Sequence, residues 1–472
     1  MEVTYSGSGQ IYFCQKEYEC DLYLNEECGG ILVKINVYGV ISNFLEFPLE
    51  VNFFSGVLSN GFKFTLIGCK REGLNDLIGR GKSIFSYSAQ YMVKGIGGKN
   101  VSRITFHKVE FQMADIIAWG NISGYSVTEN YDLTCKENTE KIIYQNGDLV
   151  VKYTVRSSML PITDWDILRE EITLKQYGII EIAFDEEKAI EEFERVYRKI
   201  KRLIEISLLR PVSLKKVTGQ SKHNTQTIGK EEYEWPIPIV SSDFFDNQRA
   251  VDPKVHQYRW INLSELTENN SFVEYFKKYE VLEPIVELYL EILQSRDMSP
   301  VRAFLNITQA LETYHARFKA SNLTDFRKRI DEVILKNRPQ AFIEQEKSFL
   351  LDSSKRQLTL QSRLADLILG EFKVFFDTGD INRMEFPSVI AKTRNYYTHY
   401  DEAIKNKERV LTNGELNIYN KALLYVLEYY LLLELGFKDE MHIAKKLNDR
   451  WGRISQELLI MKQSKEMFNN TQ

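Results

Sequence analysis

Several features that would place this chain in a familiar class are missing from its 472 residues. No stretch approaches the ~20 consecutive apolar residues that a membrane-spanning helix needs, so we expect no membrane segment. The first residues, Met1–Tyr5, lack a basic region followed by an apolar one, and we therefore expect no signal peptide. The net charge of −5 gives no overall attraction to polyanions. Any contact with nucleic acid must come from a local cluster of charges.

Cysteine and histidine are both scarce, with five and six residues in the chain. The cysteines are irregularly spaced within the first third of the sequence and comprise Cys14, Cys20, Cys28, Cys69 and Cys135. An odd number of cysteines without close C-x-x-C pairs is typical of reduced thiols in a cytosolic protein and does not predict a zinc site. We therefore expect a cytoplasmic protein with no metal site and no cofactor.

Length and patterning predict a multidomain protein whose N-terminal half is rich in strands. Residues 1–184 contain short alternating or apolar runs, such as Ile31–Val37 and Leu149–Val155, which indicate strands. Asn146-Gly147 predicts a tight hairpin turn between two of them. Many short strands without helices between them favour a β-sandwich or a jelly-roll-like domain. We expect this domain to serve in sensing or regulation.

Residues 185–271 are predicted to connect the N-terminal domain to the rest of the chain. Asp185–Leu209 has apolar residues at helical spacing, with Asp185 placed to cap the helix. Its glutamates precede its arginines and lysines, which complements the helix dipole and predicts a solvated helix surface. Residues 215–231 are polar with little periodicity, so they predict a linker or a mobile loop.

From residue 272 to residue 472 the apolar residues recur at helical spacing, which predicts an all-α bundle of six or seven helices. The predicted helices are Phe276–Leu293, Val301–Phe318, Phe326–Leu335, Leu358–Phe376, Val389–His399, Leu416–Leu435 and Met441–Leu459. In the second of these, His315 lies in the middle of the apolar stripe. We expect it to be a structural histidine bonded to Glu312, one turn back on the same helix.

One hexapeptide, Arg394-Asn395-Tyr396-Tyr397-Thr398-His399, places a cation, an amide and an imidazole beside one another. Arginine presents a planar fork of donors that suits phosphate, and histidine exchanges protons near neutral pH. At 100° per residue Asn395 and His399 share a helix face, whereas Arg394 and His399 are about 140° apart. We favour a composite site in which arginine and histidine come from two copies of the chain. A locally bent or widened helix is the alternative.

The spacing Arg394-Asn395-x-x-x-His399 resembles the signature of the HEPN superfamily of ribonucleases. Phe304–His315 is similar to the first core helix of the ApeA-like HEPN branch, and the likeness spans roughly residues 274–472 after a β-rich region that is also ApeA-like. The resemblance implies a helical homodimer or higher oligomer that cleaves RNA in prokaryotic defence against phage. Some relatives in toxin pairs carry a tyrosine two residues after the histidine. This chain has Asp401 there, so modification by a partner enzyme is not implied.

The resemblance also implies roles for single residues. Arg394, Asn395 and His399 are expected to be catalytic, and Glu312 is expected to lie close to them and to orient the arginine or support the histidine. Independently of the resemblance, the aromatic rings of Tyr396 and Tyr397 predict stacking on the bases of single-stranded RNA. The alternative for both tyrosines is packing in a core or in a dimer seam.

The residues of the hexapeptide predict a metal-independent endoribonuclease that works through attack of the ribose 2′-hydroxyl on the neighbouring phosphate. The resemblance implies that this activity serves anti-phage defence by abortive infection. Accessible single-stranded loops, such as those of tRNA, are the expected target. The N-terminal domain is expected to restrain or trigger cleavage in response to a phage component. One alternative is a non-catalytic RNA-binding or assembly module with a HEPN-like helical domain. The other is a purely structural Arg-Asn-His network.

Overall fold

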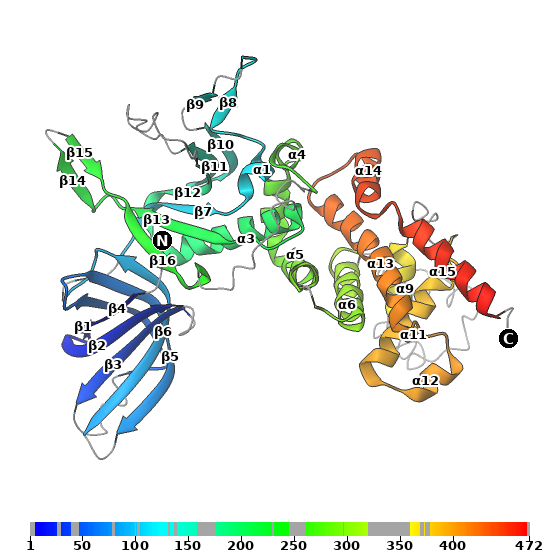
Figure 1. Ribbon diagram of the computed structural model, residues 1–472, viewed down its shortest axis with the longest axis horizontal. Coiled ribbons are helices and arrows are strands. Elements are labelled where there is room, and N and C mark those ends of the chain that lie inside the picture. Colours follow the sequence, from blue (N-terminus) through cyan, green and yellow to red (C-terminus); the bar gives the residue numbers. More distant parts are fainter. Residues whose placement is uncertain are drawn as a thin grey trace, which may run out of the picture. The chain divides into compact units, whose positions relative to one another are not determined.

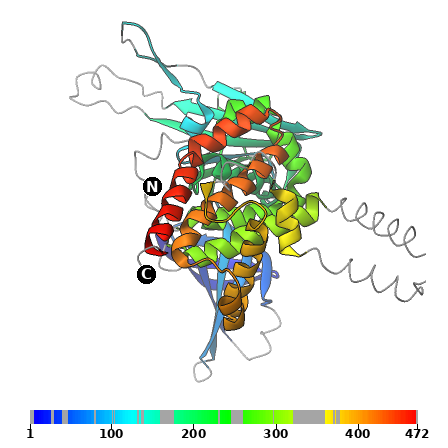
Figure 2. The same ribbon diagram turned by 90° about the vertical axis from the view of Figure 1, so that its right-hand side faces the viewer.

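The structure is a computed structural model of the chain. It describes residues 5–25, 30–38, 47–77, 81–99, 101, 104–130, 133–135, 139–157, 175–228, 231–244, 260–295, 297–319, 359–368, 372 and 378–469. The chain separates into two compact units, Met1–Ser264 and Glu265–Gln472. The first unit is built on strands and the second on helices, which confirms the predicted fold class (Figures 1 and 2).

Six antiparallel strands of the first unit close into a barrel. They are β1 (Tyr5–Phe13), β2 (Lys16–Asn25), β3 (Gly30–Tyr38), β4 (Glu50–Leu58), β5 (Lys63–Leu77) and β6 (Lys82–Lys94). Their spatial order is β6-β3-β2-β1-β4-β5, and the pairing of β5 with β6 closes the ring. At the seam between β1 and β4 the backbones approach closely at Gly9, where a Cβ would collide with the carbonyl oxygen of Val57.

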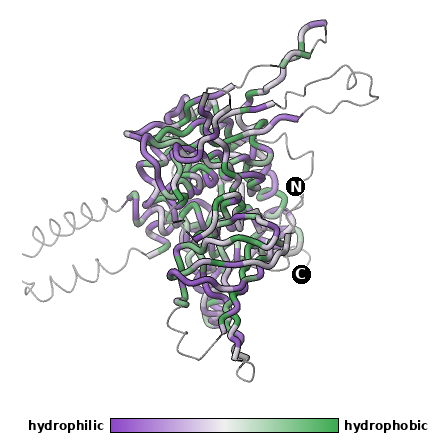
Figure 3. Tube along the Cα trace, turned by 90° about the vertical axis from the view of Figure 1, so that its left-hand side faces the viewer, coloured by the Kyte–Doolittle hydropathy of each residue, from purple (hydrophilic) through white to green (hydrophobic). Residues whose placement is uncertain are grey.

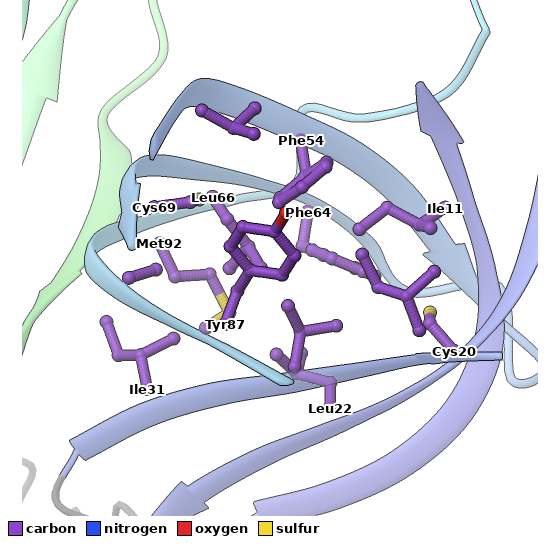
Figure 4. Packing of buried hydrophobic residues seen from close by; sticks show 14 of the residues in the cluster. Ile11, Cys20, Leu22, Ile31, Phe54, Phe64, Leu66, Cys69, Tyr87 and Met92 are labelled. Carbon is purple, nitrogen blue, oxygen red and sulfur yellow. The ribbon is translucent and has the colours of Figure 1, made fainter. Parts of the chain in front are cut away.

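Alternation along the strands fills the barrel with apolar side chains. In β3, Ile31, Val33 and Ile35 are buried while the residues between them are partly exposed. Figure 3 colours the trace by hydropathy, and hydrophobic and hydrophilic residues alternate along many of its segments. Figure 4 shows Phe54 and Tyr87 inside the barrel, where their rings meet edge to face with centroids 5.0 Å apart. Full burial of such a side chain contributes about 1.5–3 kcal/mol. The interior therefore stabilises the barrel as a unit.

The sheet continues from β6 into an open antiparallel sheet. From β6 outward its strands are β16 (Ile237–Ser241), β13 (Leu214–Gln220), β7 (Phe106–Met113), β12 (Gln176–Lys188), β11 (Leu149–Ser157) and β10 (Thr139–Asn146). Helix α3 (Ile190–Leu208) packs on this sheet, with Tyr197 stacked on Phe111 at a centroid distance of 4.2 Å. The remaining described elements of the unit are α1 (Ile116–Gly120), β8 (Tyr125–Val127), β9 (Leu133–Cys135), β14 (Thr225–Ile228), β15 (Glu231–Glu234) and the 3-10 helix η3 (Ser242–Phe244).

The prediction of a linker over residues 215–231 is wrong. The segment begins within β13, which lies between β7 and β16 in the sheet. The strand is short and carries Lys215 and Lys216, so its apolar alternation is weak in the sequence, although Leu214 and Val217 are buried. Pairing on both sides, rather than local pattern, therefore sets the structure of this segment.

The predicted start of the connector helix at Asp185 is also wrong. Strand β12 continues to Lys188, and Ala189 begins α3 without a side-chain cap. The strand-rich unit runs to Ser264, whereas the sequence predicts the end of the N-terminal domain at residue 184. The hairpin at Asn146-Gly147 is confirmed, because it joins β10 to β11 and Gly147 has a φ of +58°, a left-handed conformation that suits glycine.

The second unit is a helical bundle. Its described helices are α4 (Leu263–Glu268), α5 (Ser271–Gln294), α6 (Pro300–Phe318), α9 (Leu360–Leu367), α11 (Phe386–His399), α12 (Glu402–Lys407), α13 (Asn413–Glu434), α14 (Glu440–Trp451) and α15 (Ile454–Asn469). Helix α6 contacts α5, α9, α11 and α13. In the described parts of the chain, no helix combines the length and the apolar character that crossing a bilayer requires.

Most predicted helices are confirmed, with two differences. The helix predicted over Leu358–Phe376 ends at Leu367 as α9, because the next residue is extended. The helix predicted over Met441–Leu459 is divided near Gly452 into α14 and α15. The helix predicted over Phe326–Leu335 lies outside the described residues.

An ionic cluster connects the segment before α11, the segment before α13, the first turn of α13 and helix α15. Arg409 lies 2.9 Å and Lys465 lies 2.5 Å from a carboxylate oxygen of Asp380, and both cations also pair with Glu415. Burial raises the pKa of Asp380, but hydrogen bonds from Lys465 and Tyr419 and the charges of the two cations outweigh this effect. They hold the pKa of Asp380 below its ordinary value of 3.8. The cluster therefore keeps both carboxylates ionised in the folded bundle.

Candidate active site

Helix α11 carries the Arg-Asn-x-x-x-His sequence as one α-helix over Phe386–His399. Pro387 occupies its first turn, where a missing backbone N–H costs no helical hydrogen bond. Ile390 and Thr393 are fully buried on the face that packs in the bundle. The helix ends at Tyr400, whose φ of +52° is left-handed. The candidate catalytic residues consequently lie in its last two turns.

The end of α11 is fixed to the segment that precedes α13. The Thr393 hydroxyl accepts a hydrogen bond from the backbone N–H of Leu411 at 3.1 Å, and the Tyr397 hydroxyl donates to the carbonyl oxygen of Leu411 at 3.0 Å. Burial raises the pKa of Tyr397, and the neighbouring tyrosines and Glu415 add to this shift. The hydroxyl therefore remains a donor, and the helix end is held from two sides.

The structure places the three predicted catalytic side chains on different sides of α11. Asn395 and His399 are exposed and lie four residues apart on one face. Arg394 is 38% exposed and reaches α6, where its Nη2 lies 3.9 Å from Oε2 of Glu312. Because α11 is α-helical along its whole length, Arg394 and His399 remain on different faces. The structure does not show a locally widened helix, and the composite site stays a prediction.

Glu312 lies between two arginines. Its Oε2 is 3.9 Å from Arg394, and its Oε1 is 3.9 Å from Nε of Arg363 on α9. At this separation the attraction is Coulombic, because the distance is too long for a hydrogen bond. The expected proximity of Glu312 to Arg394 is what the structure shows, while the catalytic role of Glu312 stays a prediction. Arg363 was not identified in the sequence, since contacts between distant segments leave no periodic signal.

His315 is fully buried, and both of its ring nitrogens have partners. Nε2 lies 3.0 Å from Oδ2 of Asp366, and Nδ1 lies 3.4 Å from Nη1 of Arg363. The predicted bond to Glu312 is wrong, because the Glu312 carboxylate is directed to the arginines. A guanidinium can only donate and an ionised carboxylate can only accept, so Nδ1 is the ring atom suited to accept from Arg363 and Nε2 the one suited to donate to Asp366. Such a satisfied, buried ring fits the expected structural role.

Tyr396 and Tyr397 are engaged by packing. Tyr396 is 9% exposed, its ring centroid lies 5.0 Å from that of Tyr397, and Nζ of Lys405 stands 5.7 Å from the centroid of the Tyr396 ring. The neighbouring Tyr400 is 65% exposed. These positions favour the packing alternative for Tyr396, and stacking of either predicted ring on RNA bases stays a prediction.

Asp401 begins the short helix that follows α11. Its Oδ1 accepts a hydrogen bond from the backbone N–H of Ala403 at 2.8 Å and thereby caps α12. This position, which is tyrosine in some toxin-pair relatives, therefore has a local structural role here. Across the ranges that the structure describes, no three histidine, cysteine, aspartate or glutamate side chains gather to hold a metal ion.

A strand-rich unit followed by a helical bundle, with Arg-Asn-x-x-x-His on one bundle helix, defines a HEPN protein with an N-terminal β-rich domain. Residues 8–279 match the family ApeA N-terminal domain 1, and residues 305–441 match the family Apea-like HEPN. The chain belongs to the ApeA family and is an anti-phage defence HEPN protein. HEPN domains are generally ribonucleases. Comparison with curated proteins gives no match, and comparison with solved structures gives none either.

Proposed function

We propose that this protein is an endoribonuclease that cleaves RNA without a metal ion and acts in anti-phage defence by abortive infection. The observation that carries the proposal is the end of α11, where Asn395 and His399 are exposed on one face and Arg394 lies beside Glu312. The Apea-like HEPN match covers all four residues. A cation, an amide and an imidazole at one accessible helix end can together bind a phosphate, stabilise its developing charge and transfer protons, as RNA cleavage without a metal demands.

Cleavage begins when a ribose 2′-hydroxyl attacks the neighbouring phosphate. His399 removes the hydroxyl proton as a general base, or donates a proton to the leaving 5′-oxygen as a general acid. The guanidinium of Arg394 stabilises the negative charge of the phosphorane. Asn395, one turn before the histidine, binds a phosphate oxygen or fixes the imidazole. The products carry 2′,3′-cyclic phosphate and 5′-hydroxyl ends, and DNA is not cut because it lacks the nucleophile.

The geometry of α11 supports a homodimer or a higher oligomer as the active form. In a single chain Arg394 reaches α6, whereas His399 lies about 140° away around the helix axis. Two copies that meet along α11 bring the arginine of one copy beside the histidine of the other. The exposed face that holds Asn395 and His399 is available for such a contact within the described chain.

The expected substrate is RNA with single-stranded loops, such as tRNA, because there the 2′-hydroxyl and the phosphate are both accessible. In this proposal the N-terminal unit senses a phage component and restrains the helical unit until it binds. The β8–β9 and β14–β15 hairpins form two-stranded sheets separate from the large sheet, and hairpins of this kind are suited to recognition.

Incubation of wild type and His399→Ala with a cellular RNA pool in the presence of a chelator tests this function. The 5′ and 3′ ends of all new fragments are then mapped, with and without extract from phage-infected cells. Cyclic-phosphate ends that only the wild type produces are the expected result. Binding of RNA by the wild type without cleavage, even with infected extract, would instead identify a non-catalytic RNA-binding module.

A further inference from the structure

We propose that Arg363 is a second phosphate-binding residue of the α11 site, positioned by Glu312 and by the buried His315. The inference rests on the proposed function, because it assigns RNA contacts within the same site. Arg363 lies on α9, a helix that contacts both α6 and α11. Three helices that are distant in the sequence therefore meet where the proposed phosphate site lies.

Two cations converge on one carboxylate at this junction. Arg363 and Arg394 each have a guanidinium nitrogen 3.9 Å from a different oxygen of Glu312. Because they share this partner, the two guanidinium groups lie close enough to contact neighbouring phosphates of one RNA strand. The Glu312 side chain is 35% exposed and that of Arg394 is 38% exposed, so an RNA strand can reach the junction.

A phosphate oxygen can compete with Glu312 for the two arginines. The Glu312 carboxylate oxygens lie 3.9 Å from the nearest guanidinium nitrogens, and the carboxylate of Asp366 is bound to Nε2 of His315. Glu312 attracts the arginines without a short hydrogen bond to either of them. A phosphate oxygen forms shorter and stronger charge-assisted bonds with a guanidinium. RNA can therefore replace Glu312 as a partner of the arginines, while the carboxylate orients them in its absence.

His315 fixes the direction of the Arg363 side chain. Its Nδ1 is the acceptor that faces Nη1 of Arg363 at 3.4 Å, while Asp366 holds the opposite nitrogen of the buried ring. The side chain of Arg363 is itself only 18% exposed. A cation held in this way loses less conformational entropy when it binds a phosphate. The planar fork is required for this geometry, so lysine is not an equivalent replacement.

The test measures binding of a single-stranded RNA oligonucleotide to the full-length His399→Ala protein over a range of salt concentrations. Adding Arg363→Gln should raise the Kd about tenfold, as expected for the loss of one charge-assisted bond. The slope of log Kd against log salt should fall by about 0.7, the value for one phosphate contact on a single strand. Arg363→Lys should weaken binding but keep the slope, because it retains the charge without the fork.

Arg302→Gln is the matched control. Arg302 lies on α6, the helix of Glu312, and pairs with Glu291 at 2.5 Å. It is ten residues, or about 15 Å along the helix, from Glu312. This variant should bind RNA with the affinity and salt slope of the His399→Ala parent. Melting temperatures identify any variant that does not fold. If Arg363→Gln does not fold, Arg363→Lys takes its place. Weaker RNA binding than in the His399→Ala parent then supports the role of Arg363, and equal binding overturns it.

The outcomes separate this inference from the proposed function. Equal affinities and salt slopes for folded Arg363→Gln and Arg302→Gln would overturn the role of Arg363. If the otherwise wild-type enzyme cleaves RNA and Arg363→Gln leaves its kcat/KM unchanged, only the present inference fails. If RNA binds through Arg363 but the wild type does not cleave it, the proposed nuclease fails and the second phosphate contact stands.

Discussion

Replacing Glu312 with glutamine is expected to slow RNA cleavage without unfolding the protein. The side chain keeps its size but loses the charge that attracts Arg394 and Arg363. Two unit charges about 4 Å apart interact by about 4 kcal/mol at the effective dielectric of a protein surface and by about 1 kcal/mol in water. Because the Glu312 side chain is 35% exposed and that of Arg394 is 38% exposed, a value near the lower figure applies.

A loss of about 1 kcal/mol in the orientation of Arg394 corresponds to a roughly fivefold lower kcat. KM should stay the same or fall, because the two arginines would then face the RNA phosphates without a competing carboxylate. A merely structural role of Glu312 would not separate kcat from KM in this way. The free energy of unfolding should change by less than about 1 kcal/mol, as is usual for an exposed ion pair.

The assay measures kcat and KM on a fluorescent single-stranded RNA at constant salt, together with the melting temperature of each variant. Glu291→Gln is the matched control, since the Glu291 side chain is 38% exposed and pairs with Arg302 at 2.5 Å. It should cleave as the wild type does. A Glu312→Gln enzyme with the melting temperature and kcat of the wild type would refute the reasoning and remove Glu312 from the site.

Smaller perturbations test the packing around the site and in the barrel. Tyr396→Ala should lower the free energy of unfolding by about 3 kcal/mol because it removes a buried ring. Tyr400→Ala, at a ring that is 65% exposed, should change the free energy of unfolding little. If urea unfolding shows the same loss of stability for Tyr400→Ala as for Tyr396→Ala, the assigned packing is contradicted. The pKa of folded Asp380 lies below its ordinary value of 3.8, so its interactions stabilise the fold above that pH, and this contribution is lost as the pH falls through the lowered pKa. Asp380→Asn should therefore show a weaker loss of stability between about pH 4 and pH 2, and an acid transition identical to that of the wild type would count against the cluster. Gly9→Ala should destabilise the barrel, because its Cβ would collide with a carbonyl oxygen of β4; wild-type stability in a thermal scan would show that the seam can move.

Local pattern was sufficient to predict the two halves of the fold. Ile31–Val37 and Leu149–Val155 have enough apolar residues in a short run to identify strands, and Gly147 marks the turn before the second run. Strand β13 was missed because its lysines mask a short alternation, and its pairing partners are distant in the sequence. The same reason explains why the barrel closure was not predicted, since closure depends on which strands meet.

The candidate site was predictable only where its residues share one helix. Arg394, Asn395 and His399 are close in the sequence, so their spacing on α11 followed from helical geometry. Arg363 and Asp366 belong to α9 and contact α6 across a long stretch of chain, a relation that no periodicity encodes. For that reason the partner expected for His315 was the nearest acid on its own helix rather than the one across the helix interface.

In the site proposed here, Arg394 and His399 act together from two copies of the chain. The most direct measurement is RNA cleavage by a mixed oligomer, obtained by co-expressing an Arg394→Ala chain and a His399→Ala chain with different tags and purifying through both tags. Neither variant alone should cleave, whereas the mixed oligomer should produce 2′,3′-cyclic phosphate ends because one composite site keeps both residues. A mixed oligomer that leaves RNA intact, under conditions in which the wild type cleaves it, would contradict the composite site.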